Sequence, residues 1–345
     1  MGISESIRIA PAIAVVGSGN WGTTLAVVQA RAGRSVLLCT REPKHAEAME
    51  QARENRRSLA GVPFPDGLRV AAGFEAATAA PLIVLAVASA FIRDTCRSLA
   101  PVLQHQHQLV SATKGLETTT GLRVSQIIGE ELPAQAPTLA VLSGPNLGGE
   151  IAAGLPAASV LASTDRDAAA VCANALATRL FRLYTTDDLI GVELGGSLKN
   201  VVALAAGICD GLEMGTNGKA AIVTRGMAEI VRLGRACGAH PLTFAGLSGY
   251  GDLFATCVSP LSRNHHLGEQ LGRGRTLEDI LTEMTMVVEG INTTVAARAL
   301  AAQYGVELPI TEQVYQVLFN RKDPRAAMED LLSRLARDER TGELV

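Results

Sequence analysis

A glycine-rich turn between a short apolar strand and a helix is the feature that most constrains the fold of this chain. Residues 13–16 read Ile-Ala-Val-Val, the turn over 17–22 reads Gly-Ser-Gly-Asn-Trp-Gly, and a helical pattern follows over 23–31. In such a unit Gly17 permits the tight turn, Gly19 lets a pyrophosphate approach the backbone, and Gly22 lets the helix pack on the strand. The pattern therefore predicts a Rossmann-type unit that binds a dinucleotide at the N-terminus of its helix.

The end of the second predicted strand, over 35–39, bears on the choice of coenzyme. An acidic residue there would bind the ribose hydroxyls of NAD, whereas a nearby arginine can accept the 2′-phosphate of NADP. The chain reads Cys39-Thr40-Arg41-Glu42, so neutral residues end the strand and Arg41 follows. We expect NADP to be slightly favoured, with Arg41 as its phosphate contact. Glu42 keeps NAD possible, and an exposed Arg41 without a role is the alternative.

The length and the order of apolar runs predict two domains. The 345 residues exceed what one hydrophobic core usually holds. Near-continuous apolar runs at 82–87, 109–112 and 139–142 predict parallel strands covered on both faces, and 157–162 and 181–184 predict two more. Beyond Leu194 the pattern becomes helical, with long stretches at 219–237 and 293–304. We predict an α/β fold, with an N-terminal doubly wound Rossmann-type sheet over 1–192 followed by an all-α domain over 193–345.

Composition and charge argue against several classes of protein. The net charge is -3 and no basic stripe stands out, which argues against a nucleic-acid partner. The six cysteines lie far apart without a Cys-x-x-Cys pair, so no standard zinc or redox motif is expected. Asp210 interrupts the longest apolar run, and the first twelve residues contain Glu5 and Arg8 without a continuous apolar core. We therefore expect neither membrane insertion nor a secretory signal, and a cytoplasmic protein.

The histidines carry no metal signature in the sequence. His265 and His266 are adjacent, but no carboxylate or cysteine pattern accompanies them. We expect both to be solvated, and likewise His105 and His107.

Lys199 is the one charged side chain between Glu193 and Asp210. The surrounding residues are otherwise apolar or small, apart from Asn200, which predicts a helix buried on most faces. Burial would disfavour the charged ammonium group, and a lysine in that state can act as a general acid or base near neutral pH. The alternative is a lysine that extends its charged end to the surface.

Further polar residues follow the ends of predicted strands. In a doubly wound sheet, ligands bind outside the carboxyl ends of the strands. Lys114 lies just past one strand, and a Ser-Gly-Pro-Asn turn over 143–146 lies past another. In the helical half, Arg263 beside Asn264 could offer donors to a phosphate or carboxylate. A solvated Lys114 and a surface Arg263 are the alternatives.

Seven motifs in order carry a resemblance to a known family. They are Gly-Ser-Gly-Asn-Trp-Gly at 17–22, Ala-Thr-Lys-Gly-Leu at 112–116, Ser-Gly-Pro at 143–145, Gly-Gly-Ser-Leu-Lys-Asn at 195–200, Gly-Asp-Leu at 251–253, Ser-Arg-Asn at 262–264 and Val-Val-Glu-Gly at 287–290. Over nearly the whole chain they resemble bacterial NAD(P)-dependent glycerol-3-phosphate dehydrogenase. The resemblance implies reversible reduction of dihydroxyacetone phosphate to sn-glycerol 3-phosphate, which feeds phospholipid synthesis. It also implies a helical domain like the C-terminal domain of 6-phosphogluconate dehydrogenase, and a homodimer.

Carried over residue by residue, the resemblance implies that Lys199 is the catalytic acid/base, and we expect Lys114 and Asn200 to be catalytic with it. No metal is expected, because the lysine supplies the positive charge. Asn200, about 100° further round the helix, is expected to orient the substrate or Lys199. The expected substrate contacts are Lys114, Gly144, Asn146, Asp252, Ser262, Arg263 and Asn264. The expected cofactor contacts are Gly17, Gly19, Asn20, Trp21, Gly22, Arg41, Lys114, Gly148, Arg263, Val287 and Glu289.

One departure from the family pattern bears on these roles. Many relatives carry Thr-Phe-Ala or Ser-Phe-Ala after the Gly-Pro pair, whereas this chain has Asn-Leu-Gly over 146–148. The roles of Asn146 and Gly148 therefore stay open.

Two other functions remain in competition. One is a dehydrogenase of similar build that acts on a β-hydroxy acid through a Lys-Asn site. The other is a non-catalytic redox sensor that binds NADP, which would need the glycine turn but no buried Lys199.

Overall fold

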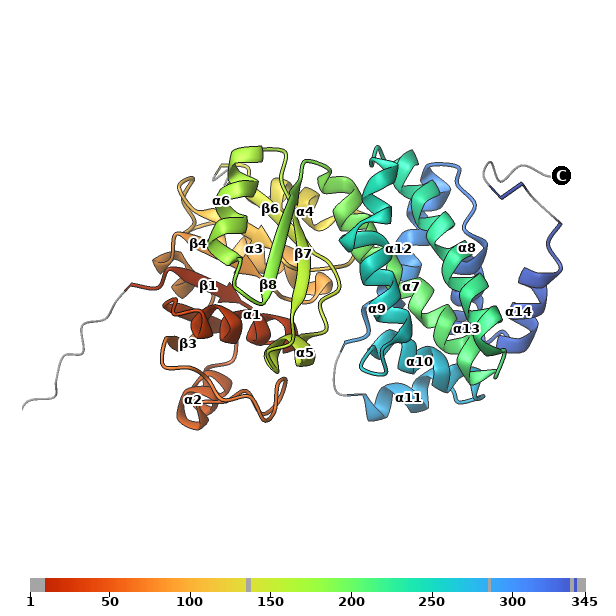
Figure 1. The fold of residues 1–345 in the computed structure, drawn as a ribbon, viewed down its shortest axis with the longest axis horizontal. Helices are drawn as coiled ribbons and strands as arrows, with labels where there is room; N and C mark the ends of the chain where they lie inside the picture. The colour runs from red at the N-terminus through yellow and green to blue at the C-terminus, as the bar shows by residue number, and fades with distance from the viewer. Residues whose placement is uncertain (1–9, 135–137, 285–286, 336–337, 340–345) are drawn as a thin grey trace, which may run out of the picture.

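The computed structural model describes residues 10–134, 138–284, 287–335 and 338–339. A sheet with helices on both faces forms the N-terminal half, and a bundle of helices forms the C-terminal half (Figure 1). The predicted fold class is therefore confirmed. The first nine residues, which were part of the argument against a secretory signal, lie outside the described residues.

Eight strands form the sheet in the order β3-β2-β1-β4-β5-β6-β7-β8. The strands from β1 to β6 pair in parallel where they are neighbours, β7 runs antiparallel to β6, and β8 is parallel to β7. Their bounds are β1 (Ile13–Val16), β2 (Val36–Thr40), β3 (Leu68–Ala72), β4 (Leu82–Leu85), β5 (Gln108–Ser111), β6 (Thr138–Ser143), β7 (Ala157–Ala162) and β8 (Phe181–Thr186). The sequence analysis did not predict β3, an edge strand that is partly exposed.

Alternate residues along the central strands belong to two separate hydrophobic cores. Ile13 and Val15 of β1 lie in the core under α1 and α6, whereas Ala14 and Val16 lie in the core under α3 and α4. This alternation explains the continuous apolar runs, because both faces of each strand are covered. The helices of this half are α1 (Asn20–Arg31), α2 (Pro43–Ala52), α3 (Ile92–Leu99), α4 (Val124–Glu131), α5 (Gly148–Ala152) and α6 (Arg166–Leu176).

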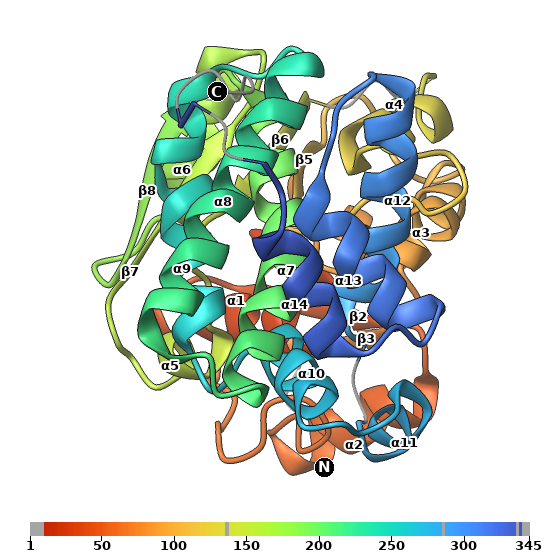
Figure 2. The same cartoon turned by 90° about the vertical axis from the view of Figure 1, so that its right-hand side faces the viewer.

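The C-terminal half is built around α7 (Leu189–Gly211), which is buried from Gly191 to Cys209. Figure 2 shows α7 surrounded by the other helices of this half. They are α8 (Gly215–Ala236), α9 (Asp252–Val258), α10 (Arg263–Gly272), α11 (Leu277–Glu283), α12 (Glu289–Gln303), α13 (Pro309–Phe319) and α14 (Pro324–Leu332). By length and composition α7 could cross a membrane, but 89% of its most apolar window is buried inside the protein. It is the core helix of this half.

The predicted division at 192/193 falls in the first turn of α7, which begins at Leu189 after β8 ends at Thr186. The division into 1–192 and 193–345 stays a prediction.

Two of the four histidines expected to be solvated are buried. His105 and His266 are exposed, but His107 and His265 are only 6% and 8% exposed. The His107 ring accepts a hydrogen bond from the backbone N–H of Gln104 at 3.0 Å, and Nε2 of His265 lies 2.7 Å from a carboxylate oxygen of Asp210. The prediction for His107 and His265 was wrong. A buried histidine needs polar partners. Asp210 is distant from His265 in the sequence, and Gln104 and His107 belong to no recognisable motif.

Glycines let α10 approach α7 backbone to backbone. A Cβ added at Gly207 would lie 2.0 Å from the carbonyl oxygen of His265, and one added at Gly268 would lie 2.1 Å from that of Leu204. No side chain fits between backbones this close. The glycines thus fix α10, and the residues at its start, against the helix that carries Lys199.

We predict that Gly207→Ala lowers the free energy of unfolding by about 1–3 kcal/mol, because the added methyl group forces the two helices apart. Gly129→Ala in α4 is the matched control, since no atom lies within 4 Å of the added Cβ. There we expect no loss, and a gain of up to about 1 kcal/mol from helix propensity. Thermal and urea unfolding followed by circular dichroism compare the two variants. Equal stabilities would contradict the close packing of α7 with α10.

Candidate active site

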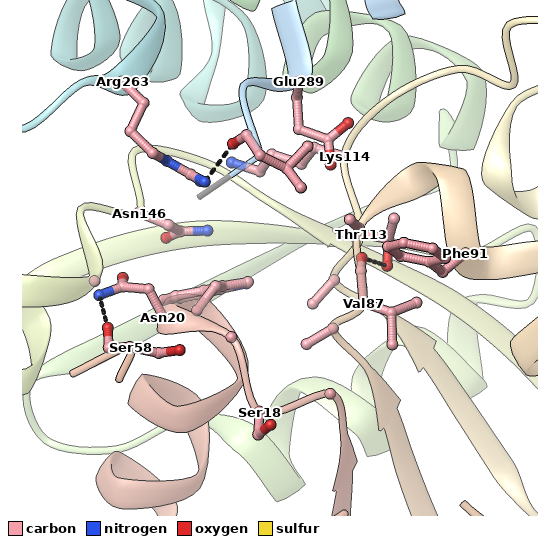
Figure 3. A pocket seen from close by; sticks show the side chains of 18 of the residues that line it. Ser18, Asn20, Ser58, Val87, Phe91, Thr113, Lys114, Asn146, Arg263 and Glu289 are labelled. Atoms are coloured by element: carbon pink, nitrogen blue, oxygen red, sulfur yellow. Dashed lines mark hydrogen bonds between the residues drawn. The ribbon is translucent and has the colours of Figure 1, made fainter. Parts of the chain in front are cut away.

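A cleft of about 680 Å³ runs from the glycine-rich turn after β1 to the middle of α7. Both halves of the chain contribute to it, and in Figure 3 Arg263 and Glu289 face Ser18 and Asn20 across it. Of the predicted site residues, the cleft is lined by Gly17, Gly19, Asn20, Trp21, Arg41, Lys114, Asn146, Gly148, Lys199, Asn200, Ser262, Arg263, Asn264, Val287 and Glu289. The structure therefore brings most of the predicted site together. Gly22, Gly144 and Asp252 are not among the lining residues.

The glycine-rich turn has the geometry that a dinucleotide needs. Gly17 has a φ of +113°, and a Cβ there would lie 2.6 Å from the carbonyl oxygen of Ala86. A Cβ at Gly22 would lie 2.0 Å from the carbonyl oxygen of Gly17, so Gly22 permits the helix to pack on the turn. At Gly19, by contrast, a Cβ would meet nothing within 4 Å. This open approach to the backbone at the start of α1 fits a coenzyme pyrophosphate.

The adenosine end of such a coenzyme would lie near the end of β2. Arg41 follows β2 there and stacks on Phe91, with the guanidinium carbon 4.5 Å from the ring centroid.

Trp21 packs edge-on against Phe181 with ring centroids 6.2 Å apart, and its buried indole N–H has no partner in the described part of the chain. A bound ligand could supply that partner.

Lys199 is buried, with 8% of its surface exposed, and its ammonium group is held by two side chains of α9. Nζ donates to Oδ1 of Asp252 and to Oγ1 of Thr256, the latter at 2.7 Å. Thr256 in turn donates to the backbone carbonyl of Asp252 at 2.6 Å, which fixes its hydroxyl as the acceptor. Since an ammonium group has three N–H donors, the third remains for the cleft.

The same aspartate also binds Lys114. Nζ of Lys114 donates to Oδ2 of Asp252 at 2.6 Å and to the carbonyl oxygen of Gly144 at 2.8 Å. Burial lowers the pKa of Lys114 to about 8, against the attraction of Asp252, which raises it. Asp252 is only 1% exposed. It is therefore the shared counter-ion of both lysines. The sequence analysis expected Asp252 to contact the substrate and did not predict this role.

Thr256 is the residue of this cluster that the sequence analysis missed. It lies four residues after Asp252 in α9, so the two side chains share a helix face. That spacing could have revealed it.

Among the described residues, the side chain of Asn200 forms a hydrogen bond with Asn264 of α10 and none with the side chain of Lys199. Nδ2 of Asn264 donates to Oδ1 of Asn200 at 3.0 Å, and the N–H of Gly290 donates to Oδ1 of Asn264 at 2.9 Å. Of the two roles expected for Asn200, this arrangement favours orienting a substrate, because Asn200 lines the cleft and its NH₂ group donates no hydrogen bond to the described residues.

The start of α10 is built as an anion site. Ser262 caps the helix by accepting a hydrogen bond from the N–H of His265 at 3.2 Å. Arg263 follows and donates to the carbonyl oxygen of Val287, the dashed contact beside Arg263 in Figure 3. The N-terminus of a helix favours negative charge, and a neighbouring guanidinium group adds to it. Together they suit a phosphate group in the cleft.

The residues that depart from the family pattern have defined surroundings. Oδ1 of Asn146 accepts from the hydroxyl of Ser159 at 2.6 Å, while its buried NH₂ group has no partner among the described residues. A Cβ at Gly148 would lie 2.2 Å from Oδ1 of Asn20, so this position packs against the glycine-rich turn. Both residues therefore remain beside the cleft.

Glu289 ties the helical half to the sheet half. Its carboxylate accepts from the hydroxyl of Ser89 at 2.6 Å and from the Ser89 N–H at 3.2 Å. Burial raises its pKa. A coenzyme that binds the Glu289 carboxylate would therefore bind it together with Ser89.

This arrangement can serve acid/base chemistry on a phosphorylated substrate beside a dinucleotide. A buried lysine with one N–H turned to the cleft can exchange a proton, and the start of α10 can bind an anion. The glycine-rich turn lines the same cleft.

Comparison with known families identifies both halves of the chain. Residues 12–169 match the family described as NAD-dependent glycerol-3-phosphate dehydrogenase N-terminus, and residues 188–329 match its C-terminus. A glycerol-3-phosphate dehydrogenase [NAD(P)+] of Desulfitobacterium hafniense is 48% identical over 93% of this chain and 91% of its own length. One from Chlorobium luteolum is 44% identical over 95% of this chain and 99% of its own.

Solved structures agree with this assignment. The crystal structure of glycerol-3-phosphate dehydrogenase from Coxiella burnetii superposes with a TM-score of 0.90 at 36% identity, covering 94% of this chain and 99% of that one. A ketopantoate reductase from Ralstonia eutropha has a TM-score of 0.58 at 15% identity, which shows a shared fold alone. On the matches to both halves and the identity to full-length relatives, this chain belongs to the NAD-dependent glycerol-3-phosphate dehydrogenase family and is an NAD(P)-dependent oxidoreductase.

Proposed function

We propose that this protein catalyses the reversible NAD(P)H-dependent reduction of dihydroxyacetone phosphate to sn-glycerol 3-phosphate, with Lys199 as general acid and base. The observation that carries the proposal is the buried ammonium group of Lys199, held by Asp252 and Thr256 with one N–H left for the cleft. The names of the full-length relatives support the choice of substrate.

When bound in the cleft, NAD(P)H would supply the hydride in the reducing direction. Negative charge then develops on the ketone oxygen, and the third N–H of Lys199 stabilises it and gives it a proton. In the oxidising direction Lys199 takes the proton of the hydroxyl group. Asp252 and Thr256 keep the ammonium group in one position throughout, so little reorganisation accompanies the proton transfer.

The phosphate of the substrate would bind at the start of α10. Arg263 and the first N–H groups of α10 offer donors there, and Asn200 and Asn264 line the adjoining part of the cleft. Binding energy from the phosphate then positions the ketone carbon for the reaction.

Charge balance favours a phosphorylated substrate. Two lysines share the single carboxylate of Asp252, so the cluster of Lys114, Lys199 and Asp252 carries one net positive charge. Arg263 adds a second positive charge to the lining of the cleft, and the carboxylate of Glu289 offsets part of it. A phosphate dianion suits this positive lining better than the single carboxylate of a β-hydroxy acid does. The lysine pair also argues against a non-catalytic sensor, which needs no such cluster.

We further infer that the product supplies phospholipid synthesis, that the protein is cytoplasmic and that it forms a homodimer. The family membership supports these inferences. Labelling of lipids from glycerol 3-phosphate in cells that lack and then regain this protein tests the first. Light scattering tests the last, with a mass of twice 36.0 kDa expected.

We predict that Lys199→Ala lowers kcat by about 10²–10³ or more, because the positioned proton donor is lost. NADPH affinity, measured by fluorescence titration, should change little. Lys219→Ala is the matched control, since Lys219 pairs with Asp210 outside the cleft. Near-normal turnover of dihydroxyacetone phosphate by Lys199→Ala would contradict the mechanism.

We predict that kcat/KM for dihydroxyacetone phosphate falls as the pH rises through about 8. The pKa of Lys114 is about 8, so its ammonium group is charged below that pH and loses its charge above it. Lys114→Arg stays charged over the whole range, and its profile should lose this fall. Stopped-flow rates between pH 6.5 and 9.5 give the midpoints. An unchanged midpoint in Lys114→Arg would assign the titration to another group.

A further inference from the structure

The loop after α2 brings a second arginine to the end of the cleft where Arg41 lies. Arg57 and Ser58 line the cleft together with Arg41, Glu42 and Phe91. In Figure 3 Ser58 lies at the left of the cleft and Phe91 at the right, with Ser18 of the glycine-rich turn below them. The sequence analysis assigned no role to Arg57.

Buried amide contacts fix the loop onto the glycine-rich turn. Asn55 has no exposed surface, and its Nδ2 donates to the carbonyl oxygen of Ser18 and to the hydroxyl of Thr23, both at 2.8 Å. On the other side of Arg57, Nδ2 of Asn20 donates to the carbonyl oxygen of Ser58 at 2.9 Å (Figure 3). The backbone of Arg57 is thus held on both sides beside the site of the dinucleotide.

The side chain of Arg57 is held only weakly. Its Nη1 lies 3.2 Å from each carboxylate oxygen of Glu42, and the two side chains are 66% and 61% exposed. Exposed ion pairs of this kind contribute little to stability. A doubly charged phosphate can therefore replace the carboxylate as the partner of Arg57 without a large cost.

We propose that Arg57 and Glu42 form an exchangeable pair that lets this end of the cleft accept both NADP and NAD. A 2′-phosphate binds Arg57, released from Glu42, together with Arg41. A 2′-hydroxyl instead donates to the carboxylate of Glu42, which keeps its contact with Arg57. Arg57 is thus a specificity-determining residue, and the inference rests on the coenzyme site of the proposed function.

Direct binding of two nucleotides that differ only by the 2′-phosphate tests the proposal. The chain has a single tryptophan, Trp21, which lines the cleft, so its fluorescence reports binding without turnover. We expect Arg57→Ala to weaken binding of 2′,5′-ADP about tenfold or more, the effect of losing a charged hydrogen bond, and to leave 5′-AMP unchanged. Glu42→Gln should weaken 5′-AMP and leave 2′,5′-ADP equal or tighter.

Arg56→Ala is the matched control. Arg56 is the neighbouring arginine, is 76% exposed, pairs with Glu54 and does not line the cleft. Both nucleotides should bind this variant as they bind the wild type. An unchanged ratio of the two affinities in Arg57→Ala would overturn the proposal. This holds whether both affinities stay the same or both fall equally because the loop has moved.

The outcome is separable from that of the proposed function. If the protein fails to reduce dihydroxyacetone phosphate but Arg57→Ala loses the preference for the 2′-phosphate, the substrate is wrong and the coenzyme pair is right. If turnover is fast and the ratio of affinities is unchanged, the function stands and the pair is rejected. Titrations of NADPH and NADH with the same variants extend the test to whole coenzymes.

Discussion

The carboxylate of Asp252 is the group around which the site is arranged. Each of its oxygens binds a different lysine, and the carboxylate is almost fully buried. Two ammonium groups this close to each other would repel without a negative charge between them. The position of Asp252 depends in turn on the π-helical turn just before α9 (Leu247–Gly251), which packs so closely on α7 that a Cβ on Gly195 would collide with the backbone at Ser248. The packing of the helical core therefore also determines where the charges lie in the cleft.

The same cluster joins the two halves of the protein. Lys114 comes from the sheet half, whereas Lys199 and Asp252 come from the helical half. Two other polar contacts cross beside it, from the N–H of Gly115 to the hydroxyl of Ser197 at 2.9 Å and from Ser89 to Glu289. The half that carries the glycine-rich turn is thus linked to the half that carries Lys199. These bonds help to set how the glycine-rich turn and Lys199 lie relative to each other.

Local patterns predicted much of this structure, and contacts between distant residues account for what they missed. The glycine-rich turn and the apolar runs predicted the sheet because those signals lie within a few residues of one another. β3 was missed because an exposed edge strand lacks an apolar run, and Thr256 because its role appears only once Lys199 is known to face α9. Asp252 was predicted as a site residue from the resemblance alone. Its place beneath two lysines arises from chain segments more than 50 residues apart, a relation that spacing in one sequence does not encode.

The sequence over 146–148, which differs from that of many relatives, affects the packing of a distant part of the chain. Gly148 faces Asn20 so closely that a side chain at 148 would collide with the Asn20 amide. That amide is also the donor to Ser58, which helps to hold the loop carrying Arg57. A larger residue at 148 would displace Asn20 and so disturb this loop, 90 residues away in the sequence. Gly148 is therefore coupled through the Asn20 side chain to the loop that carries Arg57.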